Sequence, residues 1–215
     1  MVSQSNFEVA EKLFLAEKYT QAAPLFELVL KNNPTDLRAI EYLGDIAGKQ
    51  KAWEKALVYY TKLKRLKPNV ANYYYKCGGA MGMKAKEVNK FKALGMISDI
   101  RSAFEKAIAL DPKHEEARWA LIELNLQLPG IVGGSQSKAI QYSNELLKIS
   151  PVDGYLSRGH IEEYFNRYAA AEIQYKKAYE IGNSKVTFQK LYQLYLKKIN
   201  NPKKAQELKD QFEKK

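Results

Sequence analysis

The side chains best suited to metal or acid–base chemistry gather around one histidine. His160 is followed by Glu162 and Glu163, and imidazole and carboxylate groups are the ligands that divalent metals use. Such a site needs three or four ligands, whereas this segment offers one imidazole with no second histidine nearby. Neither a Ser/His/Asp set nor a supported pair of catalytic carboxylates occurs elsewhere in the sequence. We therefore expect no metal, no cofactor and no enzymatic activity.

The single cysteine, Cys77, excludes an intramolecular disulfide and any site built from several cysteines. A catalytic thiolate needs a positioned base, and the chain has only two histidines, His114 and His160. Cys77 lies in a run of small and aromatic residues, Tyr-Tyr-Tyr-Lys-Cys-Gly-Gly. The sequence predicts a buried structural thiol, because free cysteine mostly behaves as a small apolar side chain.

A glycine-rich segment runs from Leu128 to Ser135 with the sequence Leu-Pro-Gly-Ile-Val-Gly-Gly-Ser. A phosphate-binding loop needs lysine and Ser/Thr at fixed offsets after the last glycine, with a strand before it. Here Gly134 is followed by Ser-Gln-Ser-Lys, so the spacing fails and nucleotide binding is not expected. Ser135 or Ser137 is suited to cap the next helix. The segment is either a structural clasp or a partner-binding tip that presents Ile131 and Val132.

A second segment, 84–92, carries four lysines against Glu87. One interpretation is a basic patch that meets an acidic partner surface or a phosphate. The other is a solvated helix extension in which Val88, Phe91 and Leu94 pack back on the fold, because short charge runs are usually plain surface. The lysines of the first interpretation are Lys84, Lys86, Lys90 and Lys92.

The elements that position these residues follow from a repeat in the first third of the chain. Ala10, Ala22, Phe26 and Pro34 recur 34 residues later as Gly44, Ala56, Tyr60 and Pro68. A fixed period of this size is typical of stacked repeats, whose units cannot bury their apolar faces alone. Helical three- and four-residue spacing fills the segments between prolines, with no sustained strand alternation, so the fold should be all-α. Helices should end before Pro34, Pro68, Pro112 and Pro151.

The repeated residues resemble the tetratricopeptide-repeat (TPR) family over nearly the whole chain. The second halves of three units carry its pattern, in Tyr19-x-x-Ala22-x-x-x-Phe26, Trp53-x-x-Ala56-x-x-x-Tyr60 and Tyr168-x-x-Ala171-x-x-x-Tyr175. The resemblance implies one domain, 1–215, folded as a right-handed superhelix of about six helix pairs. The expected repeats are 3–36, 37–70, 71–114, 115–151, 152–185 and a capping pair at 186–215. Extra residues near 85–95 and 129–137 are expected between the two helices of repeats three and four. The glycine-rich phrase is also similar to one in bacterial repeat proteins.

In this family the first helix of each pair lines a concave groove where peptides dock. The corresponding positions here are Glu11, Glu41, Asp45, Tyr75, Trp119, Glu123, His160 and Glu163. Family members that bind chaperones hold a C-terminal carboxylate with lysine and asparagine, whereas the matching positions here include Phe7 and three carboxylates, so such a clamp is disfavoured. An acidic, aromatic groove would suit a basic or apolar segment, with Tyr75 and Trp119 as anchors. The alternative is that Trp119 belongs to the core.

These observations predict a non-catalytic scaffold that binds a protein or peptide. The net charge of +11 raises nucleic acid as an alternative partner, but the lysines are scattered and no nucleic-acid motif is visible. A third alternative is self-association through Tyr192, Tyr195 and Leu196, if these are exposed, so the protein is expected to be a monomer or a weak homo-oligomer. No run reaches the roughly 18 apolar residues of a membrane span. Residues 1–6 lack a signal-peptide pattern, and the compartment stays open between cytoplasm and, for a processed exported protein, periplasm.

Overall fold

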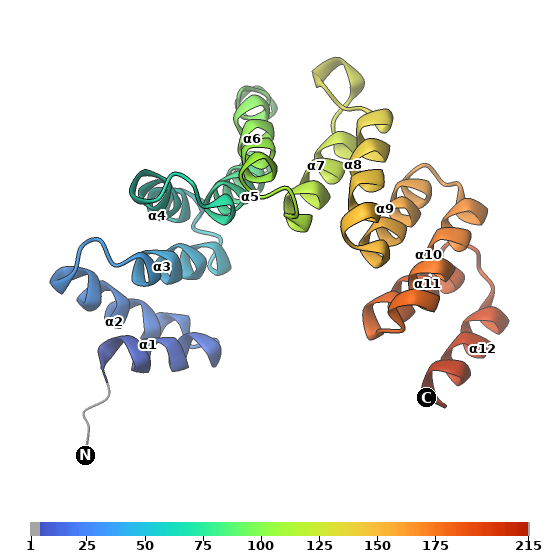
Figure 1. The fold of residues 1–215 in the computed structure, drawn as a ribbon, viewed down its shortest axis with the longest axis horizontal. Coiled ribbons are helices and arrows are strands. Elements are labelled where there is room, and N and C mark those ends of the chain that lie inside the picture. The colour runs from blue at the N-terminus through green and yellow to red at the C-terminus, as the bar shows by residue number, and fades with distance from the viewer. Residues whose placement is uncertain (1–4, 215) are drawn as a thin grey trace. The chain divides into compact units, whose positions relative to one another are not determined.

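The computed structural model describes residues 5–214, and this part of the chain contains helices and turns but no strand. The chain divides after Pro112 into two compact units, each of which is built from three helix pairs. Within a unit the helices follow one another in chain order and pack against their sequence neighbours (Figure 1). The predicted all-α repeat fold is therefore confirmed.

Unit 1 contains the first three helix pairs. Its helices are α1 (Asn6–Leu15), α2 (Tyr19–Asn32), α3 (Leu37–Lys49), α4 (Trp53–Leu66), α5 (Ala71–Glu87) and α6 (Lys90–Leu110). Three of them begin at capping side chains, since Ser5, Asp36 and Asn89 each accept a hydrogen bond from the backbone amide three residues later. The second helices end just before the predicted prolines Pro34, Pro68 and Pro112.

Small residues on the first helices let the aromatic rings of the second helices approach closely. A Cβ atom added to Gly44 would lie 2.5 Å from the Tyr60 ring, and one added to Gly78 would lie 2.7 Å from the Phe104 ring. In the first pair, Ala10 and Phe26 are both fully buried in one apolar cluster. Cys77 is buried in the next cluster, where burial raises the pKa of its thiol, as expected of a structural cysteine.

The extra residues of the third repeat lie within its helices. α5 and α6 are 17 and 21 residues long, and only Val88 and Asn89 separate them. The predicted segment 85–95 thus forms the end of α5, a two-residue link and the first turns of α6. We call the exposed end of this pair, Met83–Leu94, the α5–α6 tip.

Unit 2 contains α7 (Glu115–Gln127), α8 (Gln136–Ile149), α9 (Pro151–Tyr164), α10 (Tyr168–Gly182), α11 (Lys185–Lys197) and α12 (Pro202–Glu213). A short 3₁₀ helix, Gly130–Val132, lies between α7 and α8. Gly159 repeats the close approach of unit 1, since an added Cβ would lie 2.4 Å from the Tyr175 ring. Gly154 lets α9 approach the α8 backbone, where an added Cβ would lie 2.3 Å from Cα of Leu147.

The last helix pair is more buried than the sequence analysis assumed. Tyr195 was expected to be exposed, but only 4% of it is accessible, because it packs in a cluster with α10 and α12. Tyr192 is half-buried and stacks on Phe188, with 5.3 Å between the ring centroids. Only Leu196, at 37%, is exposed as predicted. The expectation of an exposed tyrosine surface at this end was therefore wrong.

Candidate protein-binding faces

The eight predicted groove residues all lie on the first helices of pairs, four in each unit. Unit 1 contributes Glu11 on α1, Glu41 and Asp45 on α3, and Tyr75 on α5. Unit 2 contributes Trp119 and Glu123 on α7, and His160 and Glu163 on α9. Each unit therefore presents its own set of four residues.

The carboxylate of Glu11 is engaged within unit 1. Its Oε1 atom accepts a hydrogen bond of 2.7 Å from the Tyr42 hydroxyl and one of 2.7 Å from the Arg38 guanidinium. The hydrogen bond from Tyr42, together with the charge of Arg38, lowers the pKa of Glu11. Both partners lie on α3, so this contact links the first helices of two successive repeats.

Lys76 pairs with the next two carboxylates of unit 1. Its ammonium nitrogen lies 2.7 Å from a carboxylate oxygen of Glu41 and 2.7 Å from one of Asp45. Asp45 also accepts a 2.7 Å hydrogen bond from the Tyr60 hydroxyl, whose pKa is raised by burial and by this carboxylate. The three predicted acidic groove residues of unit 1 therefore each have a basic partner in the same unit.

Tyr75 lies on α5 with its ring half-buried. Its ring centroid is 6.0 Å from that of Phe104 on α6, with the two planes tilted by 45°. The ring thus contributes to the packing between the two helices of its repeat.

In unit 2 the structure brings Trp119, Glu123 and His160 together. The Trp119 ring is half-buried, packs against two apolar clusters and lies 6.3 Å from the His160 ring. Its indole N–H donates a 2.9 Å hydrogen bond to Asp153 on α9. Glu123 contacts Nε2 of His160. Trp119 therefore belongs partly to the core and partly to an accessible surface, which combines the two interpretations of the sequence.

Two acidic residues that the sequence analysis missed complete this surface. The pKa of Glu115 is raised, first by burial and then by the charge and hydrogen bonding of Asp153, with a further contribution from Glu116. Glu115 precedes Trp119 by one helical turn, a spacing that would have placed it on the same face of α7. We call Glu115, Trp119, Glu123, Asp153 and His160 the α7–α9 acidic face.

Glu163, the last predicted groove residue, has a different contact. It accepts a 2.9 Å hydrogen bond from the hydroxyl of Tyr175, the residue whose ring packs on Gly159. Burial and the Glu163 carboxylate both raise the pKa of Tyr175. Glu163 therefore holds a core tyrosine in place, as Asp45 does for Tyr60.

The lysines of the α5–α6 tip differ in their contacts. Lys84 forms a 3.2 Å ion pair with Glu54, whereas Lys86, Lys90 and Lys92 are exposed. The predicted packing of apolar residues onto the fold is wrong for Phe91, which is 88% exposed, and for Leu94, which is 45% exposed. Val88 is half-buried.

The glycine-rich segment is a turn closed by its own backbone. The amides of Val132 and Gly134 donate to the carbonyl of Pro129 at 3.0 and 3.1 Å, and the Ser135 amide donates to the carbonyl of Asn125 at 3.0 Å. Ser135 caps α8 as predicted, by accepting from the Lys138 amide. Ile131 is 96% exposed at the outer end of this turn, and Val132 is half-buried.

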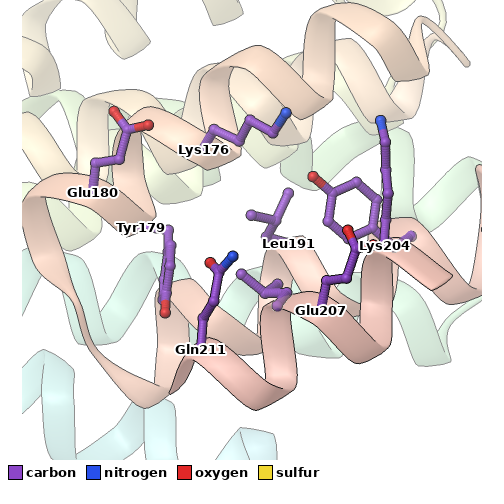
Figure 2. Close-up of a pocket in the computed structure, with 9 residues that line it drawn as sticks. Lys176, Tyr179, Glu180, Leu191, Lys204, Glu207 and Gln211 are labelled. Carbon is purple, nitrogen blue, oxygen red and sulfur yellow. The ribbon is translucent and has the colours of Figure 1, made fainter. Parts of the chain in front are cut away.

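A pocket of about 310 Å³ lies among α10, α11 and α12. Figure 2 shows Lys176 and Lys204 at one end of it and Tyr179 and Gln211 at the other. Both lysines bind the carboxylate of Glu172, at 2.8 and 2.9 Å, and Tyr195 donates to the same carboxylate at 3.0 Å. These bonds connect the last three helices, so the polar groups beside this pocket stabilise the fold.

Within residues 5–214 no three metal-ligating side chains cluster in a way that could hold an ion. None of the helices described in this range has the length and apolar character that crossing a membrane requires.

Comparison with known proteins identifies the repeat. A family model for the tetratricopeptide repeat matches residues 10–71, while no curated protein matches the sequence. A thermophilic TPR protein from Thermus thermophilus superposes with a TM-score of 0.71 and 18% identity, over 89% of this chain and 97% of that one. PilW, a widely conserved type IV pilus biogenesis factor, superposes with a TM-score of 0.70 and 18% identity, over 96% of this chain and 90% of PilW.

A third similar structure is YrrB, described as a TPR protein with an unusual peptide-binding site. Its TM-score is 0.56 and its identity 15%, over 85% of this chain and 87% of that one. At such identities the likeness concerns the fold, and it extends well beyond the repeats that the family model matches. Residues 10–71 therefore match the tetratricopeptide-repeat family, and the chain as a whole has the fold of tetratricopeptide-repeat proteins.

Proposed function

We propose that this protein is a non-catalytic scaffold that binds a basic segment of a partner protein on the α7–α9 acidic face. The observation that carries the proposal is the grouping of Trp119 with Glu115, Asp153 and Glu123 on two neighbouring first helices. An aromatic ring with carboxylates around it suits a lysine or arginine side chain, because the ring attracts the cation while the carboxylates pair with it.

The charge balance favours unit 2 over unit 1 for this role. In unit 1, Arg38 and Lys76 already pair with the predicted groove carboxylates. In unit 2, burial and the neighbouring carboxylates raise the pKa of Glu115. A cation from a partner would therefore reduce the repulsion between these carboxylates. A bound basic side chain should therefore gain more electrostatic energy in unit 2 than in unit 1.

The family also supports a binding role. TPR proteins generally act as scaffolds for other proteins, and the structurally similar YrrB is described as having a peptide-binding site. The first helices α7 and α9, which carry the acidic face, are the helices that line the binding groove in this family.

A binding measurement tests the proposal. We expect fluorescein-labelled peptides that contain lysine and arginine to bind the full chain, and matched acidic peptides not to bind. Trp119→Ala should weaken binding by more than about fivefold, the loss typical of an aromatic anchor. Glu105→Gln, on exposed α6 surface, is the control and should leave binding unchanged.

Glu115→Gln separates binding from folding. At pH 7 it should weaken peptide binding, because a charge that meets the cation is lost. It should not lower the unfolding temperature, because a carboxyl group with a raised pKa destabilises the fold when ionised. Binding by the wild type should fall as the pH drops toward that raised pKa, and less steeply in the variant. Equal affinity of wild type, W119A and E115Q, all folded by circular dichroism, would refute the assignment.

A further inference from the structure

The α5–α6 tip combines with the neighbouring α3–α4 turn to form a basic surface on unit 1. The indole N–H of Trp53, at the start of α4, donates a 2.7 Å hydrogen bond to Glu87 at the end of α5. The ion pair between Glu54 and Lys84 joins the same two helices. Six lysines lie on the turn and the tip, which we call the basic tip: Lys49, Lys51, Lys84, Lys86, Lys90 and Lys92.

The two acidic residues at this surface, Glu54 and Glu87, each have a partner within unit 1. Glu87 accepts a hydrogen bond from Trp53, and Glu54 pairs with Lys84. The pKa of Glu54 is lowered first by a hydrogen bond from its own backbone and then by Lys84. Five further lysines face solvent there, so the basic tip carries a local excess of positive charge. It can therefore attract a surface that carries many negative charges.

Apolar side chains project from the same surface. Phe91 is 88% exposed in the first turn of α6, between Lys90 and Lys92. Leu94 and Met83 are 45% and 40% exposed. The same end of the helix pair thus carries three exposed apolar side chains and several exposed lysines.

We propose that the basic tip binds the surface of a membrane that contains anionic lipids. The lysine ammonium groups would meet the lipid phosphates, while Phe91 and Leu94 enter the boundary between headgroups and acyl chains. Lysine is suited to this arrangement because its long stem lies along apolar surface while its charge stays at the headgroups.

The aliphatic residues favour a lipid over other polyanions. A single-stranded nucleic acid would use Phe91 for base stacking, but it offers no apolar phase for Leu94 and Met83. An acidic protein would need a hollow complementary to the protruding ring, whereas a fluid lipid surface adapts to it. The basic tip also offers both positive charge and exposed apolar side chains, the two contributions that together strengthen attachment to a membrane surface.

Co-sedimentation with vesicles tests this proposal independently of peptide binding. We expect the full chain to pellet with phosphatidylcholine vesicles that contain phosphatidylglycerol, and not with pure phosphatidylcholine. Each exposed lysine should contribute about fivefold to the affinity, so K86E/K90E/K92E should lose about a hundredfold or more. Phe91→Ala with Leu94→Ala should lose about tenfold. The control K185E/K190E/K197E, with the same charge change on exposed α11, should bind like the wild type.

A spectroscopic variant reports insertion directly. Tryptophan emission of F91W should shift to shorter wavelength when phosphatidylglycerol vesicles are added, relative to the wild type with its two native tryptophans. The proposal is overturned if the wild type does not bind these vesicles, or if the α11 control loses as much affinity as K86E/K90E/K92E. It is also overturned if a single-stranded DNA oligonucleotide binds through the tip while the vesicles do not.

Discussion

At the scale of single residues, the same device holds a tyrosine in two repeats, one in each unit. A glycine on the first helix makes room for the ring, and a carboxylate of that helix accepts the hydroxyl hydrogen. Gly44 and Asp45 do this for Tyr60, and Gly159 and Glu163 do it for Tyr175. The buried ring therefore packs without leaving an unsatisfied hydroxyl, which would cost about 1–3 kcal/mol.

Gly44→Ala and Gly159→Ala should each destabilise the fold. The added Cβ would lie 2.5 or 2.4 Å from the ring, so the helices must move apart. We expect a loss of about 1–3 kcal/mol in the free energy of unfolding, measured by urea denaturation. Gly79→Ala is the matched control, since nothing lies within 4 Å of its added Cβ. It should stabilise its helix by about 0.5–1 kcal/mol. A loss at Gly79 equal to that at Gly44 would contradict the packing explanation.

At the scale of elements, one carboxylate ties α10 to both helices of the last pair. Burial alone would raise the pKa of Glu172, but hydrogen bonds from Lys176, Lys204 and Tyr195 outweigh it and lower the pKa to about 2. Tyr195 lies on α11 and Lys204 on α12. The terminal pair is thus anchored by charge as well as by its apolar cluster.

Glu172→Gln should therefore lower stability in a pH-dependent way. A carboxylate with a depressed pKa stabilises the fold above its ordinary pKa of 4.5, and this contribution disappears as the pH falls toward about 2. We expect the variant to be less stable by about 2 kcal/mol at pH 7, with a difference that shrinks between pH 4.5 and 2. Urea titrations over this range provide the measurement. A difference that stays constant with pH would show that the charge is not responsible.

Element boundaries were largely predictable from the sequence, because proline and the small-aromatic spacing have local causes. Helices end before Pro34, Pro68 and Pro112, as the missing amide of proline requires. The form of the third-repeat insertion was not predictable, because its residues suit either a loop or a longer helix. The structure shows α5 and α6 extended, with Phe91 left outside the core.

The sequence predicted which helices carry the residues of the candidate site, but not which charged partners those residues contact. Repeat phase placed the acidic residues on first helices, as the structure has them. It did not show that Lys76 would reach both Glu41 and Asp45, because that contact depends on the spacing and rotation of successive helices. Glu115 and Asp153 were missed for the same reason, since their proximity arises only when α7 and α9 pack together.

At the scale of the whole molecule, the prediction of a single domain spanning 1–215 can be examined with two natural probes. Trp53 lies in unit 1 and Trp119 in unit 2. Neighbouring repeats stabilise one another, so a single domain should unfold with coincident transitions. The variant Trp119→Phe keeps only Trp53, so its fluorescence reports on unit 1, whereas Trp53→Phe keeps only Trp119 and reports on unit 2. For each variant we expect the unfolding midpoint measured by fluorescence to agree with the midpoint measured by circular dichroism. Separate midpoints would indicate two independently folding units.

The net charge of +11 is distributed unevenly over the two proposed binding surfaces. The basic tip concentrates six lysines, whereas the α7–α9 acidic face groups carboxylates around Trp119. The sequence also raised two alternatives to protein binding, namely nucleic-acid binding and self-association. Salt titration and sedimentation of the free protein address them separately from the peptide and vesicle experiments.

The closed turn between α7 and α8 has a consequence for how this protein tolerates mutation. A Cβ on Gly134 would lie 1.7 Å from the carbonyl oxygen of Leu128, and Gly133 has a φ of 92°. Ile131, only a few residues away, touches almost nothing. Natural variation should therefore leave the two glycines untouched while residue 131 changes freely. If relatives instead keep an apolar residue at 131, selection must come from something outside the chain.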